Sequence, residues 1–288
     1  MSIKKALAWA TKELKKAKIK TASLDALVLL CFILKKPKEW IYLNDNKKLA
    51  AENFKAYKKL IERRKRFEPV AYITNHKEFY GLDFYVDKNV LIPRPETEIL
   101  VEQVMQEISN SKIQITNKFQ NLNDPIKIAD LGTGSGCIAI SLAKHLKTCE
   151  VFAIDISENA LKIAQKNAQK NKVKIKFLKG NFLEPLKQKV DIIVSNPPYV
   201  LKSEKIGTEV RYEPKIALYI KDKKFPEKLL SEVSKKLKDK GVAFLEIGKN
   251  QKQLFKKAAE KIIPKVKIEF LKDYSRINRI AKIKKGSF

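Results

Sequence analysis

Hydrophobic residues recur every three or four positions along the first 70 residues, which is the spacing of one face of an α-helix. The pattern predicts helices over residues 3–17, 24–34 and 50–66, with a break at Pro37. Glycine does not occur in this stretch. We therefore expect a small helical bundle over residues 1–69.

The pattern changes over residues 70–92, which are rich in β-branched and aromatic residues. Asn75-His76 and Gly81 interrupt this run, so it predicts a β-hairpin that links two domains. Pro93-Arg94-Pro95 then ends any strand, and helical spacing returns over residues 96–108. The polar stretch 109–124 predicts an exposed loop.

From Ile126 onward, short apolar runs alternate with amphipathic segments. The runs predict strands over 126–130, 150–154, 173–178, 190–195 and 242–247, and the segments predict helices over 137–146, 158–171, 225–238 and 251–262. The last two runs, 266–271 and 277–283, predict an antiparallel hairpin. This alternation predicts right-handed crossovers and an α/β fold with an open, mostly parallel sheet.

Composition adds one further feature, a large positive charge. The 288 residues include 61 Lys and Arg against 32 Asp and Glu, a formal net charge of +29. Seven of the basic residues are Arg, and the excess is spread along the chain rather than gathered in a tail. One interpretation is an AT-rich genome, and the other is attraction to ribosomal RNA or an acidic protein.

Several classes of protein are excluded. No apolar run reaches the ~20 residues that span a bilayer, and the first residues lack the apolar core of a secretory signal. The three cysteines form no close pair and the two histidines lie far apart, so neither a disulfide framework nor a metal site is expected. We expect a cytoplasmic protein with no metal and no membrane contact.

Three of the nine glycines lie within the motif Asp130-Leu131-Gly132-Thr133-Gly134-Ser135-Gly136. It follows a predicted strand and opens a helix, where glycines allow close ligand approach and free amides donate hydrogen bonds. A dinucleotide fingerprint would place its third glycine one residue later. The spacing resembles motif I of class I S-adenosylmethionine-dependent methyltransferases, whose ligand carries a carboxylate, an ammonium and an adenosine.

Other residues fit the same ligand. Asp155 ends the second strand of this region, where an acidic side chain accepts hydrogen bonds from ribose hydroxyls, although it could instead cap the next helix. By the resemblance, Asn181 lies where this fold contacts adenine. The predicted cofactor residues are Gly132, Thr133, Gly134, Ser135, Gly136, Asp155, Asn181 and Asn196.

A second motif, Ser195-Asn196-Pro197-Pro198-Tyr199, follows the apolar strand 190–195. Two prolines cannot continue a central strand, so they predict a rigid turn beside the glycine motif. Asn196 and the Pro197 carbonyl could accept both N–H bonds of an NH₂ group on an sp² carbon, and Tyr199 could stack on its plane. We expect Asn196, Pro197 and Tyr199 to be catalytic, and these three with Pro198 to bind the substrate. Adenine N6 and the glutamine side chain both fit this motif.

Three other segments, 63–73, 78–81 and 91–98, closely resemble the bacterial release factor glutamine N5-methyltransferases. Further matches are Glu213-Pro214, Ala217-Leu218, Glu246-Ile247-Gly248, Gln251, Asp273 and Arg279. The resemblance implies a helical substrate-binding domain over 1–69, a β-hairpin linker over 70–92 and a Rossmann-like class I methyltransferase domain over 93–288. It implies methyl transfer from S-adenosylmethionine, with S-adenosylhomocysteine as product, to the glutamine of the Gly-Gly-Gln loop in class 1 peptide chain release factors.

The resemblance also bears on residues outside these motifs. Arg94 and Glu96 belong to its interdomain segment and would shape the site, unless they form an ordinary salt bridge or cap. The family usually has glycine where Asn75 stands, and a Gly-rich stretch where this chain has residues 219–224. Both departures fall in predicted loops, so they bear on contacts with a partner rather than on the chemistry.

Two other functions stay open from the sequence. An adenine N6-methyltransferase would have to flip its base, usually with an added recognition domain, and the bundle contains no recognisable nucleic-acid module. A non-catalytic basic protein of the ribosome would explain the charge but not the intact glycine motif. We expect a monomer that acts on release factors, has only indirect proximity to the ribosome and binds no specific nucleic acid.

Overall fold

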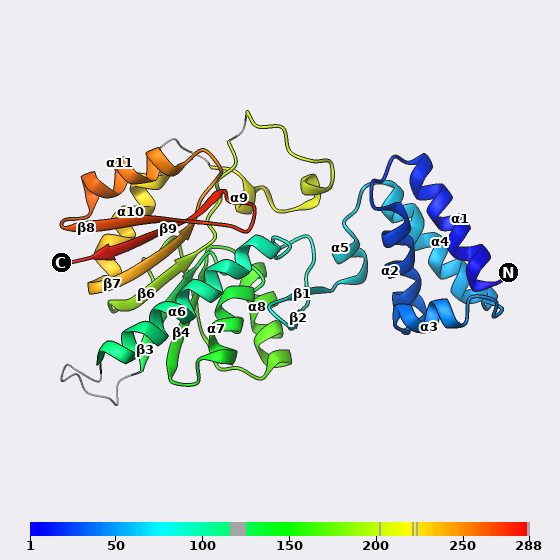
Figure 1. Cartoon of the computed structure of the whole chain (residues 1–288), viewed down its shortest axis with the longest axis horizontal. Helices are drawn as coiled ribbons and strands as arrows, with labels where there is room; N and C mark the ends of the chain where they lie inside the picture. The colour runs from blue at the N-terminus through cyan, green and yellow to red at the C-terminus, as the bar shows by residue number, and fades with distance from the viewer. Residues whose placement is uncertain (116–124, 202, 221, 223, 287–288) are drawn as a thin grey trace. The chain divides into compact units, whose positions relative to one another are not determined.

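The computed structural model describes residues 1–115, 125–201, 203–220, 222 and 224–286 (Figure 1). The chain divides into two compact units. One comprises Met1–His76 with Lys205–Tyr212, and the other comprises Lys77–Glu204 with Glu213–Phe288. Residues 205–212 thus group with the helical unit although they follow the Asn-Pro-Pro-Tyr motif in sequence.

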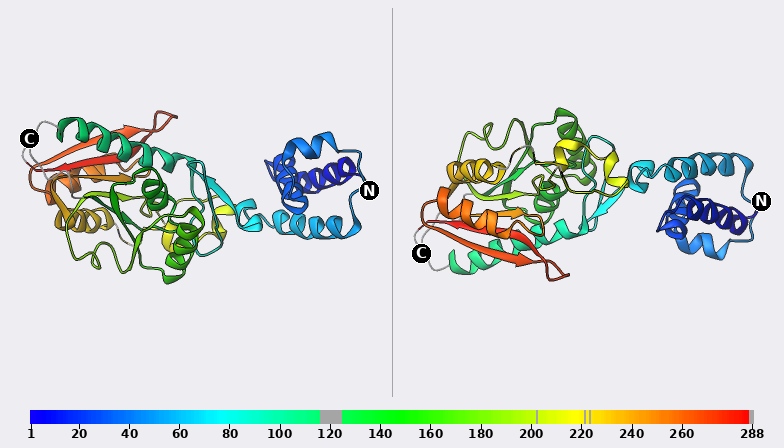
Figure 2. Two further views of the ribbon diagram at one scale, coloured as in Figure 1. Left: turned by 90° about the horizontal axis from the view of Figure 1, so that it is seen from below. Right: turned by 90° about the horizontal axis from the view of Figure 1, so that it is seen from above.

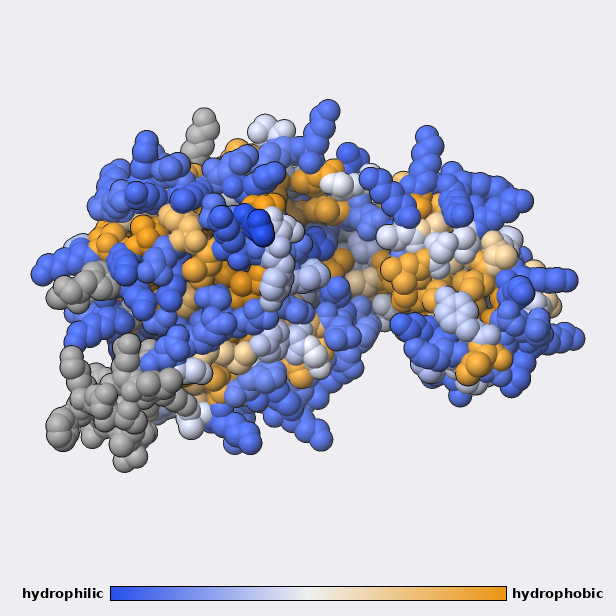
Figure 3. Space-filling view, viewed as in Figure 1, coloured by the Kyte–Doolittle hydropathy of each residue, from blue (hydrophilic) through white to orange (hydrophobic). Residues whose placement is uncertain are grey.

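The first unit is a helical bundle around its own apolar core. Its helices are α1 (Ile3–Lys16), α2 (Ala22–Leu34), α3 (Lys38–Leu43), α4 (Ala51–Lys65), α5 (Val70–Thr74) and the short 3₁₀ helix η2 (Glu209–Tyr212). The three predicted helices are confirmed, and α3 was missed because six residues are too few for a periodic pattern. Figure 3 shows hydrophobic residues exposed on this unit. Leu24, Val28 and Phe32 of α2 are among the exposed large hydrophobic residues of the chain.

A buried arginine fastens the segment 205–212 to this bundle. The Arg64 side chain is 2% exposed, and its Nε donates a hydrogen bond of 2.7 Å to Asp25. The same guanidinium group forms an ion pair with Glu209. The Tyr212 hydroxyl donates a hydrogen bond of 2.7 Å to the carbonyl of Arg66. Because a buried charge is stable only when it is paired, Arg64 keeps both partners in place.

The prediction of a hairpin over all of residues 70–92 was wrong at its start. Val70–Thr74 form α5, since the amides of Tyr72 and Ile73 both bond to the Pro69 carbonyl at 3.0 Å. Burial of apolar side chains against the bundle outweighs their β-propensity. Asn75 ends this helix at φ 52°, a left-handed conformation that asparagine and glycine both tolerate, which explains the exchange with the family's glycine.

The hairpin itself is shorter than expected. Its strands are β1 (Lys77–Phe79) and β2 (Leu82–Phe84), joined by Tyr80-Gly81 with positive φ at both residues. Positive φ at both central positions is typical of the tight turn whose twist matches a two-stranded hairpin. Phe79 and Phe84 pack edge to face, with ring centroids 6.1 Å apart.

The second unit contains a seven-stranded sheet in the order β5-β4-β3-β6-β7-β9-β8. Its strands are β3 (Ile126–Leu131), β4 (Cys149–Asp155), β5 (Lys176–Lys179), β6 (Val190–Ser195), β7 (Leu237–Glu246), β8 (Val266–Lys272) and β9 (Asn278–Lys285). The first five strands in this order are parallel, whereas β9 is antiparallel to both β7 and β8. This confirms the mostly parallel sheet with a terminal antiparallel hairpin.

Helices cover both faces of this sheet. They are the 3₁₀ helix η1 (Pro95–Thr97), α6 (Glu98–Ile115), α7 (Cys137–His145), α8 (Glu158–Asn171), α9 (Lys215–Leu218), α10 (Phe225–Lys236) and α11 (Lys252–Ile262). Figure 2 shows α6 on one side of the strands and α10 with α11 on the other. The main apolar core lies between the strands and α10 and α11.

The predicted loop over 109–124 was wrong over its first part, because residues 109–115 continue α6. Polar residues oppose a helix only weakly once its preceding turns are formed and packed. The rest of that prediction, 116–124, lies outside the described residues.

Candidate active site

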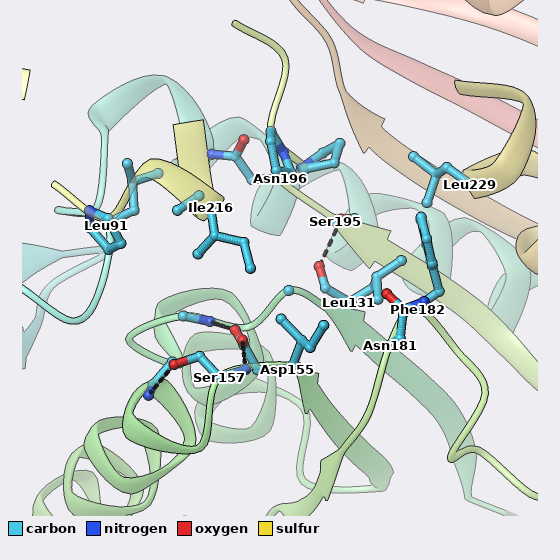
Figure 4. A pocket seen from close by; sticks show the side chains of 18 of the residues that line it. Leu91, Leu131, Asp155, Ser157, Asn181, Phe182, Ser195, Asn196, Ile216 and Leu229 are labelled. Carbon is cyan, nitrogen blue, oxygen red and sulfur yellow. Dashed lines mark hydrogen bonds between the residues drawn. The ribbon is translucent and has the colours of Figure 1, made fainter. Parts of the chain in front are cut away.

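The two predicted motifs leave neighbouring strands at the same edge of the sheet. β3 and β6 are parallel and adjacent, and Leu131 pairs with Ser195 at their carboxyl ends. The Ser195 hydroxyl donates a buried hydrogen bond of 2.7 Å to the Leu131 carbonyl (Figure 4). In open α/β sheets, ligands bind outside the carboxyl ends of the strands where the strand order reverses, and β3 lies at that point here.

The three glycines of the first motif serve two purposes. All three have positive φ, at 71° for Gly132, 55° for Gly134 and 82° for Gly136. A Cβ added to Gly132 would meet nothing within 4 Å, and one on Gly134 only a carbonyl oxygen at 3.9 Å. At Gly136 it would lie 2.8 Å from Ile140 and 3.1 Å from Ala164. The first two glycines therefore leave space for a ligand, and the third lets α7 and α8 pack closely.

The Asp155 carboxyl group binds backbone amides of the glycine loop and of the segment that follows β4. Its Oδ2 accepts a hydrogen bond of 2.9 Å from the Gly134 amide, and its Oδ1 accepts one of 2.8 Å from the Ser157 amide. Burial raises the pKa of the Asp155 carboxyl above its usual value. The N-cap of α8 is Ser157, which accepts from Ala160 at 3.2 Å. The alternative role of Asp155 as the helix cap is therefore ruled out.

A cavity of about 290 Å³ lies between the two motifs. In Figure 4, Asp155 and Ser157 lie on one side of it, and Ser195 and Asn196 lie on the opposite side. The predicted site residues that line it are Gly132, Gly134, Asp155, Asn181, Asn196, Pro197 and Pro198. Lining residues that the sequence did not single out include Asn89, Val90, Leu91, Ile156, Phe182, Ile216 and Phe225.

Four predicted residues do not line this cavity, namely Thr133, Ser135 and Gly136 of the glycine loop and Tyr199 of the second motif. Thr133 donates a hydrogen bond of 2.7 Å to Asp130, whose Oδ2 also accepts from the amide of Ala139 at 3.2 Å. Burial raises the pKa of the Asp130 carboxyl to about 7. Within the described part of the chain, Oδ1 of Asp130 has no hydrogen-bond partner.

Asn196 belongs to a chain of hydrogen bonds that the sequence did not reveal. Its Nδ2 donates to Oγ1 of Thr97 at 3.0 Å, and the Thr97 hydroxyl donates to Oε2 of Glu246 at 2.8 Å. The Tyr199 hydroxyl donates to Oε1 of the same carboxyl group at 3.3 Å. The family resemblance included Glu246 and the segment 91–98 that contains Thr97, but it did not indicate that either residue contacts the Asn-Pro-Pro-Tyr motif.

This network is buried. Thr97 is 2% exposed and Glu246 is 3% exposed. Burial raises the pKa of the Glu246 carboxyl to about 7 and that of the Tyr199 hydroxyl to about 12. Gln251 further holds the motif, since its Nε2 donates to the Tyr199 carbonyl at 2.9 Å.

Arg94, Glu96 and the segment 219–224 were the other residues that the family resemblance brought into question. Arg94 forms an ion pair of 2.7 Å with the buried carboxylate of Glu213, whereas Glu96 is exposed. In segment 219–224, where the family usually has a Gly-rich stretch, Tyr219 and Asp222 line the cavity. Residues 221 and 223 lie outside the described ones.

Two features are absent from the described residues. No group of three or more His, Cys, Asp or Glu side chains there is arranged to hold a metal ion. None of the helices described is both long and apolar enough to cross a membrane.

Comparisons with known proteins agree with this geometry. Residues 5–74 match the model of the PrmC N-terminal domain, and residues 109–212 match that of the methyltransferase small domain. A release factor glutamine methyltransferase from Clostridium acetobutylicum is 37% identical over an alignment of 296 positions, and the match covers 99% of this chain and 99% of the relative. This chain belongs to the release factor glutamine methyltransferase family.

Some of the similar proteins are longer than this chain. A bifunctional methyltransferase from Rickettsia typhi is 41% identical over an alignment of 265 positions, and the match covers 87% of this chain and 51% of the relative. The chain therefore spans about half the length of that relative. A solved methyltransferase from Pyrococcus furiosus is 22% identical with a TM-score of 0.50, and the match covers 78% of this chain and 99% of that one. That likeness concerns the fold alone, which is the class I methyltransferase fold.

Proposed function

We propose that this chain transfers a methyl group from S-adenosylmethionine to the side-chain amide nitrogen, N5, of a glutamine. The substrate glutamine is that of the Gly-Gly-Gln loop in class 1 peptide chain release factors. The observation that carries the proposal is the position of Asn196, at the wall of a cavity whose opposite wall carries Asp155. Family membership supports the choice of glutamine over adenine.

The cavity residues fit the proposed methyl donor. The open Cβ positions of Gly132 and Gly134 leave the loop backbone accessible to its amino acid part. Asp155 would accept hydrogen bonds from ribose hydroxyls, with Asn181 near the adenine. When bound, the cofactor supplies an electrophilic methyl group on a sulfonium sulfur.

The second motif fits a planar NH₂ group. An amide nitrogen is a poor nucleophile because its lone pair is delocalised over the carbonyl group. Oδ1 of Asn196 and the carbonyl oxygen of Pro197 would accept its two N–H bonds and so orient the nitrogen toward the methyl group. The Tyr199 ring, anchored through Glu246, would fix the plane of the amide. The proposed transfer would form one C–N bond and break the S–CH₃ bond, with S-adenosylhomocysteine as product, and the proton lost by the nitrogen would pass to water.

We assign the binding of the release factor to the helical unit, residues 1–69 in the sequence prediction. On α2, Leu24, Val28 and Phe32 are spaced four residues apart and lie 60%, 39% and 45% exposed. An exposed apolar stripe on a helix is a common element of protein interfaces. The lysine excess would speed the encounter with an acidic partner.

The remaining parts of the proposal concern assembly and location. The proposal includes action as a monomer. The three cysteines are free thiols, in keeping with the reducing cytoplasm where translation takes place. Proximity to the ribosome would be indirect, through the release factor, with no specific nucleic-acid partner.

A methylation assay tests the proposal. A purified class 1 release factor is incubated with the protein and S-adenosylmethionine beside a parallel reaction on double-stranded DNA. Mass spectrometry should find one added methyl group on the Gly-Gly-Gln peptide and none on adenine. Methylated adenine with an unchanged peptide would instead identify an adenine N6-methyltransferase. If calorimetry detected no binding of S-adenosylmethionine, the result would favour a non-catalytic basic protein of the ribosome.

A further inference from the structure

The side-chain amide of Asn196 can take two orientations, and only one suits the proposed reaction. With its oxygen toward the substrate, the amide accepts a substrate N–H bond; with its NH₂ group there, it would oppose the substrate's own donors. Asparagine does not choose between them by itself, because its oxygen and nitrogen ends are nearly the same size. The choice must come from the residue that faces the other end of the amide.

Thr97 supplies that choice. A threonine hydroxyl has one hydrogen to donate and lone pairs that accept. Oγ1 of Thr97 lies 2.8 Å from Oε2 of Glu246, and when this carboxyl group is ionised it can only accept, so the hydroxyl hydrogen is then committed to Glu246. Oγ1 can then only accept from Asn196, which must turn its NH₂ group toward Thr97 at 3.0 Å. Oδ1 of Asn196 has no hydrogen-bond partner in the described parts of the chain.

The same carboxyl group also fixes the aromatic ring of the motif. Oε1 of Glu246 accepts from the Tyr199 hydroxyl at 3.3 Å, while Oε2 serves Thr97. One buried group therefore holds Tyr199 directly and Asn196 through Thr97. The contacts are protected from water, since Thr97 and Glu246 are 2% and 3% exposed.

We propose that Thr97 and Glu246 are positioning residues that lock the Asn196 amide with its oxygen toward the substrate nitrogen. The inference rests on the proposed function for the identity of the substrate, but the orientation itself is a property of the free protein. Neither residue lines the cavity, and each contacts a side chain of the motif, Thr97 at Asn196 and Glu246 at Tyr199.

The test uses Thr97→Val, which removes the hydroxyl at nearly constant shape, and Thr97→Ser, which restores it. Thr97→Val should lower kcat for methylation of a class 1 release factor about 10-fold, the effect of losing one hydrogen bond, while KM changes by less than about twofold. Thr97→Ser should keep about half of the wild-type kcat or more. A fall in both variants alike would overturn the proposal.

A second readout needs no substrate. The side-chain amide of Asn196 is observed by ¹⁵N NMR of the full chain, and its signals are assigned by their loss in Asn196→Asp. They should shift and exchange faster with solvent in Thr97→Val, and return in Thr97→Ser. Unchanged Asn196 signals in a folded Thr97→Val protein would overturn the proposal.

A matched control removes a similar hydroxyl elsewhere. The Thr21 hydroxyl donates a hydrogen bond of 2.8 Å to Asp25 in the helical unit, so Thr21→Val loses the same type of contact. It should leave the Asn196 signals in place, and a shift as large as that of Thr97→Val would overturn the proposal. If wild-type protein methylates no release factor, the proposed function fails, and the NMR comparison still decides the role of Thr97.

Discussion

The hydroxyl of Ser195 lies 2.7 Å from the carbonyl oxygen of Leu131 and joins the ends of two adjacent parallel strands. One strand leads into the glycine loop, and the other leads into the Asn-Pro-Pro-Tyr turn. This buried contact fixes the distance between the two walls of the cavity.

Ser195→Ala should lower the free energy of unfolding by about 1–2 kcal/mol, because it removes a buried hydrogen bond and leaves the Leu131 carbonyl without this donor. Urea denaturation measures the change. Ser141→Ala is the matched control, since the buried Ser141 hydroxyl has no hydrogen-bond partner among the residues described. Its removal should be neutral or stabilising, so equal losses in the two variants would contradict the assigned role of Ser195.

The glycine loop should respond differently at its first and last glycines. Gly136→Ala should cost about 3 kcal/mol of stability, from left-handed strain and from overlap with Ile140 and Ala164. Gly132→Ala should cost about 1 kcal/mol from strain alone, yet weaken S-adenosylmethionine binding, because its Cβ enters the open side of the loop. Thermal unfolding and calorimetry separate the two effects, and the reverse ranking in stability would refute this division.

Asp155→Asn should weaken binding of S-adenosylmethionine about 10-fold or more, because charged acceptors form the stronger hydrogen bonds with hydroxyl groups. Isothermal titration calorimetry measures the dissociation constant. Asp191→Asn is a matched control, since Asp191 also accepts from a backbone amide, that of Lys127 at 2.9 Å, but does not line the cavity. An equal loss of affinity in both variants would remove Asp155 from the binding site.

The sequence predicted the parts of this protein that depend on local pattern. The glycine motif and the Asn-Pro-Pro-Tyr motif are each five to seven residues long, so their turns depend on neighbouring residues alone. The hydrophobic spacing of the flanking strands and helices predicted that both motifs lie at the same edge of the sheet. The contacts of Thr97 could not be predicted, because its partners Asn196 and Glu246 are 99 and 149 positions away. The error at residues 70–74 has a similar origin, since burial against a distant core overrode local propensity.

Stability should depend on pH through Glu246. Burial raises the pKa of this carboxyl from 4.5 to about 7, so the folded protein retains a proton that the unfolded chain releases between these values. The free energy of unfolding therefore falls as pH rises through this window. Glu246→Gln does not titrate, so it should gain stability relative to wild type between pH 5 and pH 8, as urea unfolding at both values would measure. A constant difference between the two proteins would contradict the raised pKa.

The central claim is that Asn196 orients a glutamine amide for methyl transfer, and tandem mass spectrometry of a class 1 release factor tests it most directly. After incubation with S-adenosylmethionine, wild-type protein should place one methyl group on the glutamine of the Gly-Gly-Gln peptide. Asn196→Ala should do so ~100-fold more slowly, the scale of losing one preorganised polar contact in a transition state, while its cofactor affinity falls far less. An unmodified peptide with wild-type protein, or an unchanged rate with Asn196→Ala, would contradict the account.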